Sequence, residues 1–571
     1  MTTDLSTTAP TVLEVRSLSV EFALRGGTFT AARDVGFKLQ AGRTLCLVGE
    51  SGSGKSVTAR AMMQLIDPPG RIARGNIMLG GEGAPVDIAT LNPRGEAIRA
   101  IRGRRIGMIF QEPMSSLSPV HTIGAQIVEV LRLHLRMDAR QARARTIELL
   151  RQVEIPDPER NIDRYTFEFS GGMRQRAMIA MALACNPQVL IADEPTTALD
   201  VTTQAEVLDL ISRMQRELGM AMLLITHDMG VVAEVADDVA VMYRGKIVEA
   251  GSVDEVFHNA RHPYTRRLLS SVLKLERTSE LKQAPAPAVA EPILSVRDLG
   301  KVYQPRKSLL SRTPKVAVNA VDGVSFDLMA GESLGIVGES GSGKTTLGRL
   351  ILRIVEPTEG AVTYRPQSGA PIDVRGLDKQ GLRNLHQQVR LIFQDPFASL
   401  NPRMTVRQII ADPLVVNRIA SGAALEARVS ELLGMVGLDP AVMERYPHAF
   451  SGGQRQRIGI ARALALNPRV LIADEATSAL DVSIRSQMLD LLLELQQQLG
   501  LSFLFISHDI GVARYFCDRV AVMRRGKIVE IGAAETICTA PEHPYTKALI
   551  SAVPHPDPRH KRMRTRTRLD A

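Results

Sequence analysis

An eight-residue pattern that occurs twice constrains this chain more than any other feature. Each copy directly follows a short apolar run that predicts a buried strand; the copies are Gly49-Glu50-Ser51-Gly52-Ser53-Gly54-Lys55-Ser56 and Gly338-Glu339-Ser340-Gly341-Ser342-Gly343-Lys344-Thr345. Glycines let the backbone wrap tightly, so that several N–H groups point into one concavity. The lysine of such a loop reaches the outer phosphates, the following hydroxyl can bind Mg²⁺, and the helix that begins there adds its positive end. The pattern therefore predicts two phosphate-binding loops.

The chain is an internal duplication. Lys344 follows Lys55 by 289 residues, and from Ser170 onward the matching positions are a constant 281 residues apart. The pairs at this constant distance are Ser170 and Ser451, Asp193 and Asp474, His227 and His508, and the His-Pro-Tyr-Thr segments 262–265 and 543–546. We therefore expect one domain over residues 1–273 and a second, equivalent domain over residues 292–553.

Two segments fall outside the repeats. Residues 274–291 are rich in Pro and Ala, which predicts an extended, solvated linker. Residues 554–571 form a basic tail. Such a tail is typical of a solvated, disordered end, and weak attraction to anionic lipid is the alternative interpretation.

Bulk properties indicate an ordinary globular protein. The chain has 571 residues, of which 45% are apolar and 23% charged, with a formal net charge of +9. It lacks the run of about 18 apolar residues that a transmembrane helix needs, and residues 1–10 lack the layout of a secretory signal. We expect a cytoplasmic chain unless a partner holds it at a membrane. The four cysteines show no C-x-x-C spacing, which favours buried thiols over a metal site or disulfides.

Polar residues follow the apolar strands of the first repeat. The runs 106–110, 189–192 and 222–225 predict buried strands, and they end at Gln111, at Asp193 and close to His227. Parallel α/β sheets bind ligands at the carboxyl ends of their strands. Between residues 122 and 153 apolar positions recur at helical spacing, which predicts a mostly helical insert.

An Asp-Glu pair follows a buried strand in each repeat. In phosphate-loop enzymes an aspartate at this place holds the Mg²⁺ ion that bridges the phosphates, a role that fits Asp193 and Asp474. The next residue, Glu194 or Glu475, is placed to orient or deprotonate an attacking water. The alternative is a helix N-cap beside a solvated charge. The phosphate loop upstream in each repeat favours the first interpretation.

Further motifs resemble those of one family, the ATP-binding cassette (ABC) ATPases. The segments 169–173 and 450–454, Phe-Ser-Gly-Gly followed by Met or Gln, resemble its signature motif. The matches to its other motifs are Gln111 and Gln394 for the Q-loop, 198–200 and 479–481 for the D-loop, and His227 and His508 for the switch histidine. The resemblance covers nearly the whole chain twice. It implies an α/β fold of two tandem P-loop ABC ATPase domains, each with a RecA-like α/β core, an antiparallel β part and a helical insert.

The same resemblance implies ATP and Mg²⁺ as cofactors, and two composite sites in a head-to-tail sandwich. One site would combine Lys55, Asp193, Glu194 and His227 with Ser451, Gly452 and Gly453, and the other Lys344, Asp474, Glu475 and His508 with Ser170, Gly171 and Gly172. The metal ligands would be Ser56, Asp193 and Gln111 in one site and Thr345, Asp474 and Gln394 in the other. Met173 departs from the glutamine usual in the motif, which leaves the equivalence of the two sites open.

The family also stacks an aromatic side chain on adenine ahead of each phosphate loop. Tyr303 fits this position in the second repeat. In the first repeat Phe22 is the candidate, with Phe29 close by, and a core role is an open alternative for either.

Two narrower features resemble the peptide-importer branch of the family. The Q-loop surroundings, 111–119 and 394–402, and both His-Pro-Tyr-Thr segments are similar to those of dipeptide, oligopeptide, glutathione and nickel importers. The resemblance implies an ATP-hydrolysing subunit that drives peptide uptake through two transmembrane permease subunits, with an extracytoplasmic substrate-binding protein. It would lie at the cytoplasmic face of the inner membrane as a peripheral protein, and it would bind no nucleic acid. Some relatives carry a cysteine-rich iron–sulfur segment, which this chain lacks, so we expect no cluster.

Two other functions compete with this interpretation. Tandem ABC ATPases that act on ribosomes or nucleic acid typically join their cassettes by a long, charged helical linker, and the Pro-Ala linker here disfavours that class. Drug or lipid exporters usually fuse the cassette to a membrane domain, which makes them the weaker alternative.

Overall fold

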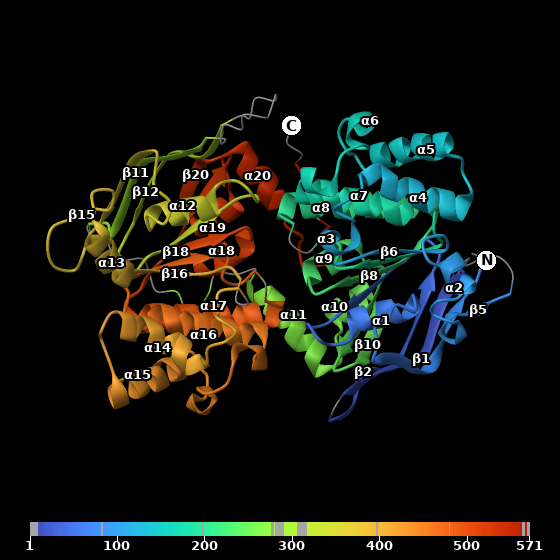
Figure 1. Cartoon of the computed structure of the whole chain (residues 1–571), viewed down its shortest axis with the longest axis horizontal. Coiled ribbons are helices and arrows are strands. Elements are labelled where there is room, and N and C mark those ends of the chain that lie inside the picture. The colour runs from blue at the N-terminus through green and yellow to red at the C-terminus, as the bar shows by residue number, and fades with distance from the viewer. Residues whose placement is uncertain are drawn as a thin grey trace, which may run out of the picture. The chain divides into compact units, whose positions relative to one another are not determined.

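The computed structural model describes residues 9–24, 26–81, 84–196, 199–275, 279, 282, 291–304, 317–395, 398–478, 480–561 and 566–567. The chain divides into two compact units. Unit 1 is Met1–Val272 with Ser551–Arg566, and unit 2 is Leu273–Ile550 with Thr567–Ala571. Each unit contains one of the two sequence repeats, and each is described by itself (Figure 1).

Unit 1 is built on two sheets. The six-stranded sheet has the order β10-β9-β3-β8-β7-β6, and the four-stranded sheet has the order β2-β1-β4-β5. The strands are β1 (Thr11–Leu24), β2 (Gly27–Gln40), β3 (Thr44–Val48), β4 (Gly70–Leu79), β5 (Val86–Asp87), β6 (Ile106–Ile109), β7 (Val189–Asp193), β8 (Ala221–Thr226), β9 (Asp238–Tyr243) and β10 (Lys246–Ser252). The helices are α1 (Lys55–Met62), α2 (Glu96–Ile101), α3 (Pro113–Ser116), α4 (Ile123–Leu135), α5 (Ala139–Gln152), α6 (Pro158–Asn161), α7 (Gly171–Leu183), α8 (Val201–Leu218), α9 (Met229–Val235), α10 (Val253–His258) and α11 (Pro263–Leu275).

The central strands of the six-stranded sheet are buried on both faces. β3 pairs in parallel with β8 and β9, and β7 pairs in parallel with β6 and β8. Successive side chains of a strand point to opposite faces. Cys46 and Val48 accordingly pack into one hydrophobic cluster with the helices α4, α5, α7 and α8, whereas Leu45 and Leu47 pack into a second with α1 and the four-stranded sheet. This double burial explains the unbroken apolar runs of the sequence.

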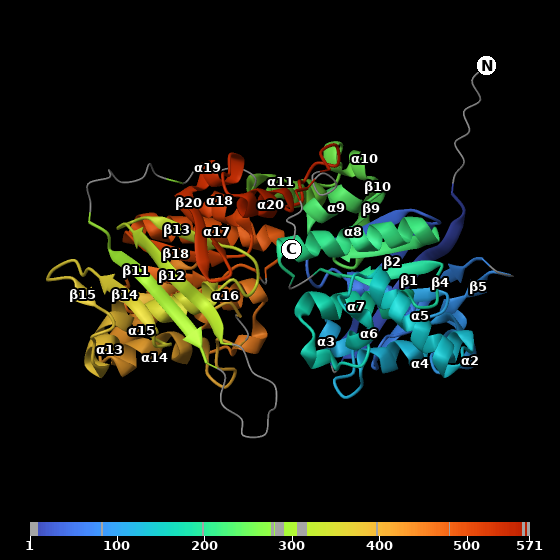
Figure 2. The same cartoon turned by 90° about the horizontal axis from the view of Figure 1, so that it is seen from above.

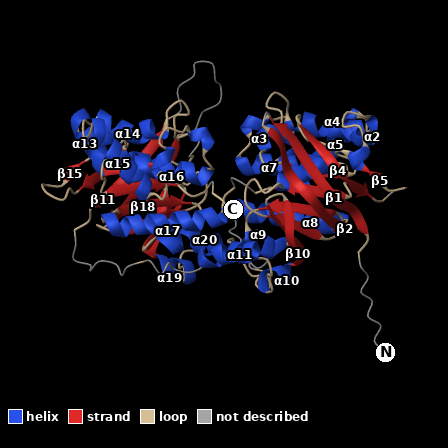
Figure 3. Ribbon diagram, turned by 90° about the horizontal axis from the view of Figure 1, so that it is seen from below, coloured by secondary structure: helices blue, strands red, loops and turns tan. Residues whose placement is uncertain are grey.

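The four-stranded sheet is antiparallel, as Figure 3 shows for the long strands β1, β2 and β4. Its strands β1 and β2 are each 14 residues long. The helical insert is confirmed as α4 and α5, capped by Thr122 and Asp138. These helices lie at the opposite end of unit 1 from α10 and β10 (Figure 2).

Unit 2 repeats this architecture. Its six-stranded sheet has the order β16-β17-β18-β13-β19-β20 and its four-stranded sheet the order β12-β11-β14-β15. The strands are β11 (Leu294–Tyr303), β12 (Val318–Leu328), β13 (Ser333–Val337), β14 (Glu359–Tyr364), β15 (Ile372–Asp373), β16 (Val389–Ile392), β17 (Val470–Asp474), β18 (Ser502–Ser507), β19 (Arg519–Arg524) and β20 (Lys527–Ala533). The helices are α12 (Lys344–Ile351), α13 (Lys379–Gln388), α14 (Val406–Val416), α15 (Gly422–Met435), α16 (Gly452–Leu464), α17 (Val482–Leu499), α18 (Ile510–Phe516), α19 (Ala534–Thr539) and α20 (Pro544–Ser551).

The chain after α20 differs from the solvated tail that the sequence suggested. Its described residues up to Lys561 belong to unit 1. Ala552 is buried in the hydrophobic cluster of that unit, and Arg559 donates to both carboxylate oxygens of Asp254 on α10 at 2.8 and 3.1 Å. A basic composition alone does not reveal such contacts, because they depend on an apolar anchor and an acidic partner far away in sequence. Most of the predicted linker, 274–291, lies outside the described residues.

Within the described ranges, no helix combines the length and the apolar character needed to cross a membrane. The four cysteines are free thiols, and Cys46, Cys185 and Cys517 are buried.

Candidate nucleotide sites

The loop after β3 has the shape that the glycine pattern predicts. Gly49 has φ +151° and Gly54 has φ +101°, conformations that favour glycine. A Cβ built at Gly49 would lie 2.2 Å from the carbonyl oxygen of Met242, and one at Gly54 would lie 2.3 Å from that of Ala31. The two glycines therefore let the loop pack directly on the backbone of β9 and β2. Gly338 and Gly343 occupy equivalent positions in unit 2.

The lysine of each loop is folded back over the loop itself. Lys55 is 5% exposed, and its Nζ donates to the carbonyl oxygens of Gly49 and Glu50 at 2.7 and 2.9 Å. Lys344 makes the same two bonds, to Gly338 and Glu339, at 2.7 and 2.8 Å. Each lysine amino group therefore lies beside the concavity of its loop, where an anion would bind.

The aspartate at the end of β7 contacts the last residue of the phosphate-loop pattern. Ser56 Oγ donates to Asp193 Oδ1 at 2.9 Å, and in unit 2 Thr345 Oγ1 donates to Asp474 Oδ1 at 3.1 Å. Burial raises the pKa of both aspartates above the ordinary value, against the lowering effect of these hydroxyl bonds. A hydroxyl and a buried carboxylate within one hydrogen bond are oxygen ligands of the kind that Mg²⁺ prefers, so the residues present fit such an ion.

Glu194 sits at a strained backbone position in the first site. Its φ is +47°, in the left-handed region that costs a non-glycine residue roughly 1 kcal/mol or more. Its N–H bonds to the carbonyl oxygen of Ile225 on β8 at 3.0 Å, which holds the conformation. The carboxylate accepts from Gln111 Nε2 at 3.0 Å and lies 3.2 Å from His227 Nδ1. Three side chains predicted from separate strands therefore meet at one point.

The same cluster forms in unit 2. Glu475 also has φ +47°, accepts from Gln394 Nε2 at 2.8 Å, and lies 3.2 Å from His508 Nδ1. Burial alone would raise the pKa of Glu475, but the hydrogen bond with His508 and nearby positive charge outweigh it and hold the pKa below the ordinary value. This glutamate is thus kept as an anion, the state in which a carboxylate can accept a proton.

The signature motifs begin the helices α7 and α16. Ser170 caps α7 through a bond from the Met173 N–H at 3.3 Å. Ser451 caps α16 in the same way, and Gln454 Oε1 also accepts from the Ser451 N–H at 3.1 Å, so the second cap is a complete capping box. The methionine at 173 cannot make this return bond. Among the described residues, no heavy atom lies within 4 Å of a Cβ built at Gly171 or Gly452.

The aromatic residues predicted to stack on adenine and the D-loop residues lie outside the clusters described above. Tyr303 ends β11 and is 44% exposed, while Phe22 on β1 packs partly against the hydrophobic core and pairs across the strands with Phe29. Ala198 and Ala479 of the D-loops lie outside the described residues. Asp200 caps α8 by accepting from the Thr203 N–H at 2.9 Å.

Sequence reasoning did not connect the His-Pro-Tyr-Thr segments with these sites, yet Tyr264 and Tyr545 contact the phosphate loops.

Comparison with known protein families agrees with this geometry. The model of the family described as "ABC transporter" matches residues 32–197 and 321–478, more than half of the chain. The chain belongs to the ABC transporter family. A second family model, described as "Oligopeptide/dipeptide transporter, C-terminal region", matches residues 248–309 and 529–569. The α/β fold of two tandem ABC ATPase cassettes, and ATP as their ligand, are thereby established.

Curated relatives match this ABC protein over nearly its full length. It is 50% identical to the "Glutathione import ATP-binding protein GsiA" of Pectobacterium atrosepticum, over 96% of this chain and 90% of that protein. It is 48% identical to the protein of the same name from Escherichia coli K12, over 97% and 91%. Among solved structures, the dimeric ATP-binding cassette MJ0796 with ADP and Pi covers 42% of this chain and 98% of its own, at 30% identity and a TM-score of 0.37.

Proposed function

We propose that this protein is the ATP-hydrolysing, energy-coupling subunit of a bacterial ABC importer for peptides, with glutathione as the leading cargo. The observation that supports it most is the cluster of Gln111, Glu194 and His227 beside a phosphate loop, formed again at equivalent positions in unit 2. The relatives named for glutathione import and the matched peptide-transporter region support the substrate class. These relatives are named for import and match nearly the whole chain, which favours the importer over the ribosome-associated alternative.

Each site has residues for every step of ATP hydrolysis. Lys55 would release its two loop carbonyls and bind the outer phosphates, with ATP completing the concavity. Mg²⁺, when bound, neutralises charge on the phosphates; Ser56, Asp193 and Gln111 would hold it. Glu194, fixed by its neighbours, orients and deprotonates the attacking water. Lys344, Thr345, Asp474, Gln394 and Glu475 would act in the same way in the second site.

The signature motif of each cassette would complete the site of the other. Ser170 and Ser451 each open a helix whose first N–H groups and dipole favour an anion. The open space beside Gly171 and Gly452 leaves those backbone groups accessible to a γ-phosphate. We therefore assign Ser170, Gly171 and Gly172 to the ATP of unit 2, and Ser451, Gly452 and Gly453 to the ATP of unit 1.

The Q-loop surroundings and the helical insert would dock two membrane permeases. In unit 1, Thr122 forms a bridge with Tyr165, so the segment after Gln111 lies beside the turn that precedes the signature. Phe167 is 65% exposed and stacks on Tyr165, and Met114 is 51% exposed. Exposed aromatic and methionine side chains are typical of a protein-binding surface. An extracytoplasmic binding protein would supply the peptide, and this chain would be peripheral at the cytoplasmic face of the membrane.

The test is a pair of substitutions in the proposed water-activating residues. The double variant Glu194→Gln and Glu475→Gln should lose ATPase turnover by a factor of about 100 or more while still binding ATP. Glu217→Gln, which removes an exposed carboxylate from α8, is the matched control and should hydrolyse at the wild-type rate. Undiminished hydrolysis in the double variant would refute the assignment. Glutathione uptake by vesicles that contain this chain with its permeases tests the cargo separately.

A further inference from the structure

The His-Pro-Tyr-Thr segments place a buried tyrosine hydroxyl on each phosphate loop. Tyr264 Oη accepts a hydrogen bond from the backbone N–H of Glu50 at 2.9 Å, and Tyr545 Oη accepts from that of Glu339 at 3.2 Å. The rings are only 4% and 1% exposed. Glu50 and Glu339 are the second residues of the two loops. The same contact has therefore formed in both halves of the duplication.

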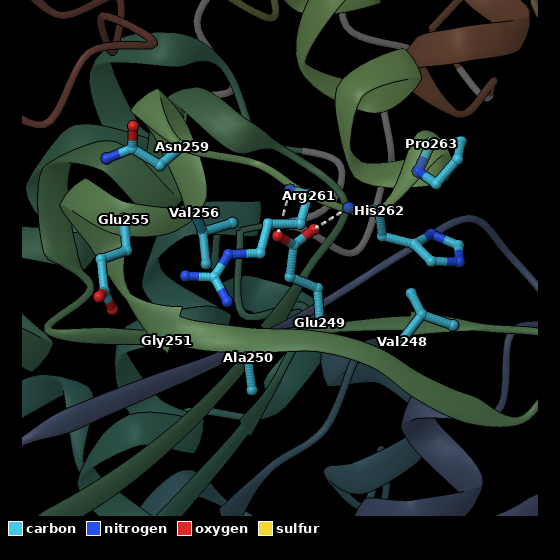
Figure 4. A pocket seen from close by; sticks show the side chains of 10 residues that line it. All are labelled: Val248, Glu249, Ala250, Gly251, Glu255, Val256, Asn259, Arg261, His262 and Pro263. Atoms are coloured by element: carbon cyan, nitrogen blue, oxygen red, sulfur yellow. Dashed lines mark hydrogen bonds between the residues drawn. The ribbon is translucent and has the colours of Figure 1, made fainter.

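The start of each tyrosine helix is fixed by a glutamate on the last strand of its sheet. The Glu249 carboxylate accepts from the N–H groups of Arg261 and His262 at 2.6 and 3.1 Å (Figure 4). His262 Nδ1 in turn accepts from the Tyr264 N–H at 3.2 Å. Burial alone would raise the pKa of Glu249, but the hydrogen bonds from the two backbone N–H groups and the nearby His262 lower it below the ordinary value. The segment is therefore anchored to β10 before its helix begins.

Unit 2 anchors its segment with the same bonds. Glu530 accepts from the N–H groups of Glu542 and His543 at 2.8 and 3.1 Å, and His543 Nδ1 accepts from the Tyr545 N–H at 3.1 Å. Thr546, like Thr265 in unit 1, is fully buried.

A planar side chain at the end of the neighbouring strand holds each tyrosine ring. In unit 1 the ring of Tyr243 stacks on Tyr264 with centroids 4.2 Å apart. In unit 2 the equivalent position is Arg524, whose guanidinium lies 4.9 Å from the centre of the Tyr545 ring. The residue before Tyr243 is Met242, whose carbonyl oxygen packs against Gly49. The ring and the loop are thus held by one strand end.

Two side chains bond to the backbone of each phosphate loop. In unit 1, Lys55 Nζ donates to the carbonyl oxygen of Glu50, and Tyr264 Oη accepts from the N–H of Glu50. A lysine that moves to the phosphates of ATP gives up that carbonyl, whereas the tyrosine bonds to a different backbone group of the same residue, so that its bond does not depend on the lysine. We propose that Tyr264 and Tyr545 are positioning residues of the two ATP sites, which hold the phosphate loops in their nucleotide-binding shape when the lysine leaves. This inference rests on the proposed ATP sites and assigns a role to a motif that the proposed function leaves unused.

Removal of both hydroxyls tests the proposal on the full chain. In Tyr264→Phe with Tyr545→Phe, the rings keep their packing but each loop loses one hydrogen bond. We expect the Kd for a non-hydrolysed ATP analogue with Mg²⁺, and the KM for ATP, to rise about five-fold, which corresponds to about 1 kcal/mol. The kcat should stay within about two-fold of wild type, because the reacting groups are untouched. Hydrogen exchange of the loop amides, measured on peptides that contain Glu50 or Glu339, should become faster.

A matched double variant controls for the loss of a tyrosine hydroxyl. Tyr364→Phe removes a buried hydroxyl from β14 of the four-stranded sheet of unit 2, and Tyr515→Phe removes a hydroxyl that donates to Asp490 at 2.5 Å. This control should bind ATP like the wild type. Equal Kd, KM and loop exchange in the test variant and the wild type would overturn the inference while leaving the ATP sites intact. A wild-type chain that binds no ATP would overturn the proposed function and, with it, this inference.

Discussion

Gly49 is the position where one added methyl group should most disturb a phosphate loop. A Cβ there would lie 2.2 Å from the carbonyl oxygen of Met242 and 2.9 Å from Ser53 Oγ, and its φ of +151° is strained for any other residue. The carbonyl belongs to β9, so it can move only if that strand moves. Steric overpacking and backbone strain each cost about 1 to 3 kcal/mol, so Gly49→Ala should lower the free energy of unfolding of unit 1 by roughly 2 to 6 kcal/mol.

Gly52 in the same loop is the matched control. Its φ is +77°, but among the described residues nothing lies within 4 Å of a Cβ built there. Only the left-handed strain remains, so Gly52→Ala should cost about 1 kcal/mol. In unit 2 a Cβ at Gly338 would lie 2.1 Å from the Met523 carbonyl oxygen, whereas Gly341 is open, so this pair repeats the experiment independently.

Thermal and urea unfolding of the full chain measure the difference. For a unit of this size, 1 kcal/mol shifts Tm by roughly 2 to 4 °C, so the alanine variants at positions 49 and 52 should be clearly separated. ATP binding should be lost in Gly49→Ala, because the loop must leave its place on β9. Equal unfolding of the two variants, or wild-type ATP affinity in Gly49→Ala, would show that the loop does not depend on this close packing.

Three further outcomes follow from the contacts. Asp193→Asn should raise the Tm of the nucleotide-free chain while weakening Mg²⁺-dependent ATP binding. Burial raises the pKa of Asp193 in the folded chain, so the ionised carboxylate lowers the stability of the fold. The gain in Tm should therefore be largest above that raised pKa, and it should vanish as the pH falls below the pKa that the aspartate has in the unfolded chain. Met173→Gln should complete the capping box that Gln454 makes in unit 2 and stabilise unit 1 by about 0.5 kcal/mol in urea unfolding. Ala552→Glu, which buries an unpaired charge in the core of unit 1, should cost about 3 kcal/mol, whereas Arg559→Ala, which breaks an exposed ion pair, should leave Tm nearly unchanged.

Much of the fold could be predicted because its determinants are local. A strand buried on both faces gives an unbroken apolar run, and the glycine pattern of a phosphate loop follows from the backbone shape that it must adopt. The ends of β7 and β8 place Asp193 and His227 at one edge of the sheet, as parallel pairing requires. The N-cap at Ser170 was predictable for the same reason, since a cap depends only on its own helix start.

Features that depend on distant partners could not be predicted. The left-handed conformation of Glu194 depends on a hydrogen bond to Ile225 on the neighbouring strand. The bond between Tyr264 and Glu50 joins residues that are 214 positions apart. Ala552 enters the core of unit 1 although it follows the second cassette in sequence. Composition and periodicity contain no information about such pairings.

The duplication shows which of these features the sites require. Where the two halves use different residues, the geometry persists: Ser56 and Thr345 both reach their aspartate, and Tyr243 and Arg524 both cover the tyrosine ring. Different side chains that reach one geometry indicate that the contact, rather than inherited sequence alone, is what each site needs. The cap of α7 is the opposite case. Met173 stands where unit 2 has Gln454, and it cannot make the return bond to the N-cap residue that completes the capping box of α16. Any difference between the two ATP sites should therefore come from the signature motif that precedes Met173 rather than from the phosphate loops. We assign this motif to the ATP of unit 2.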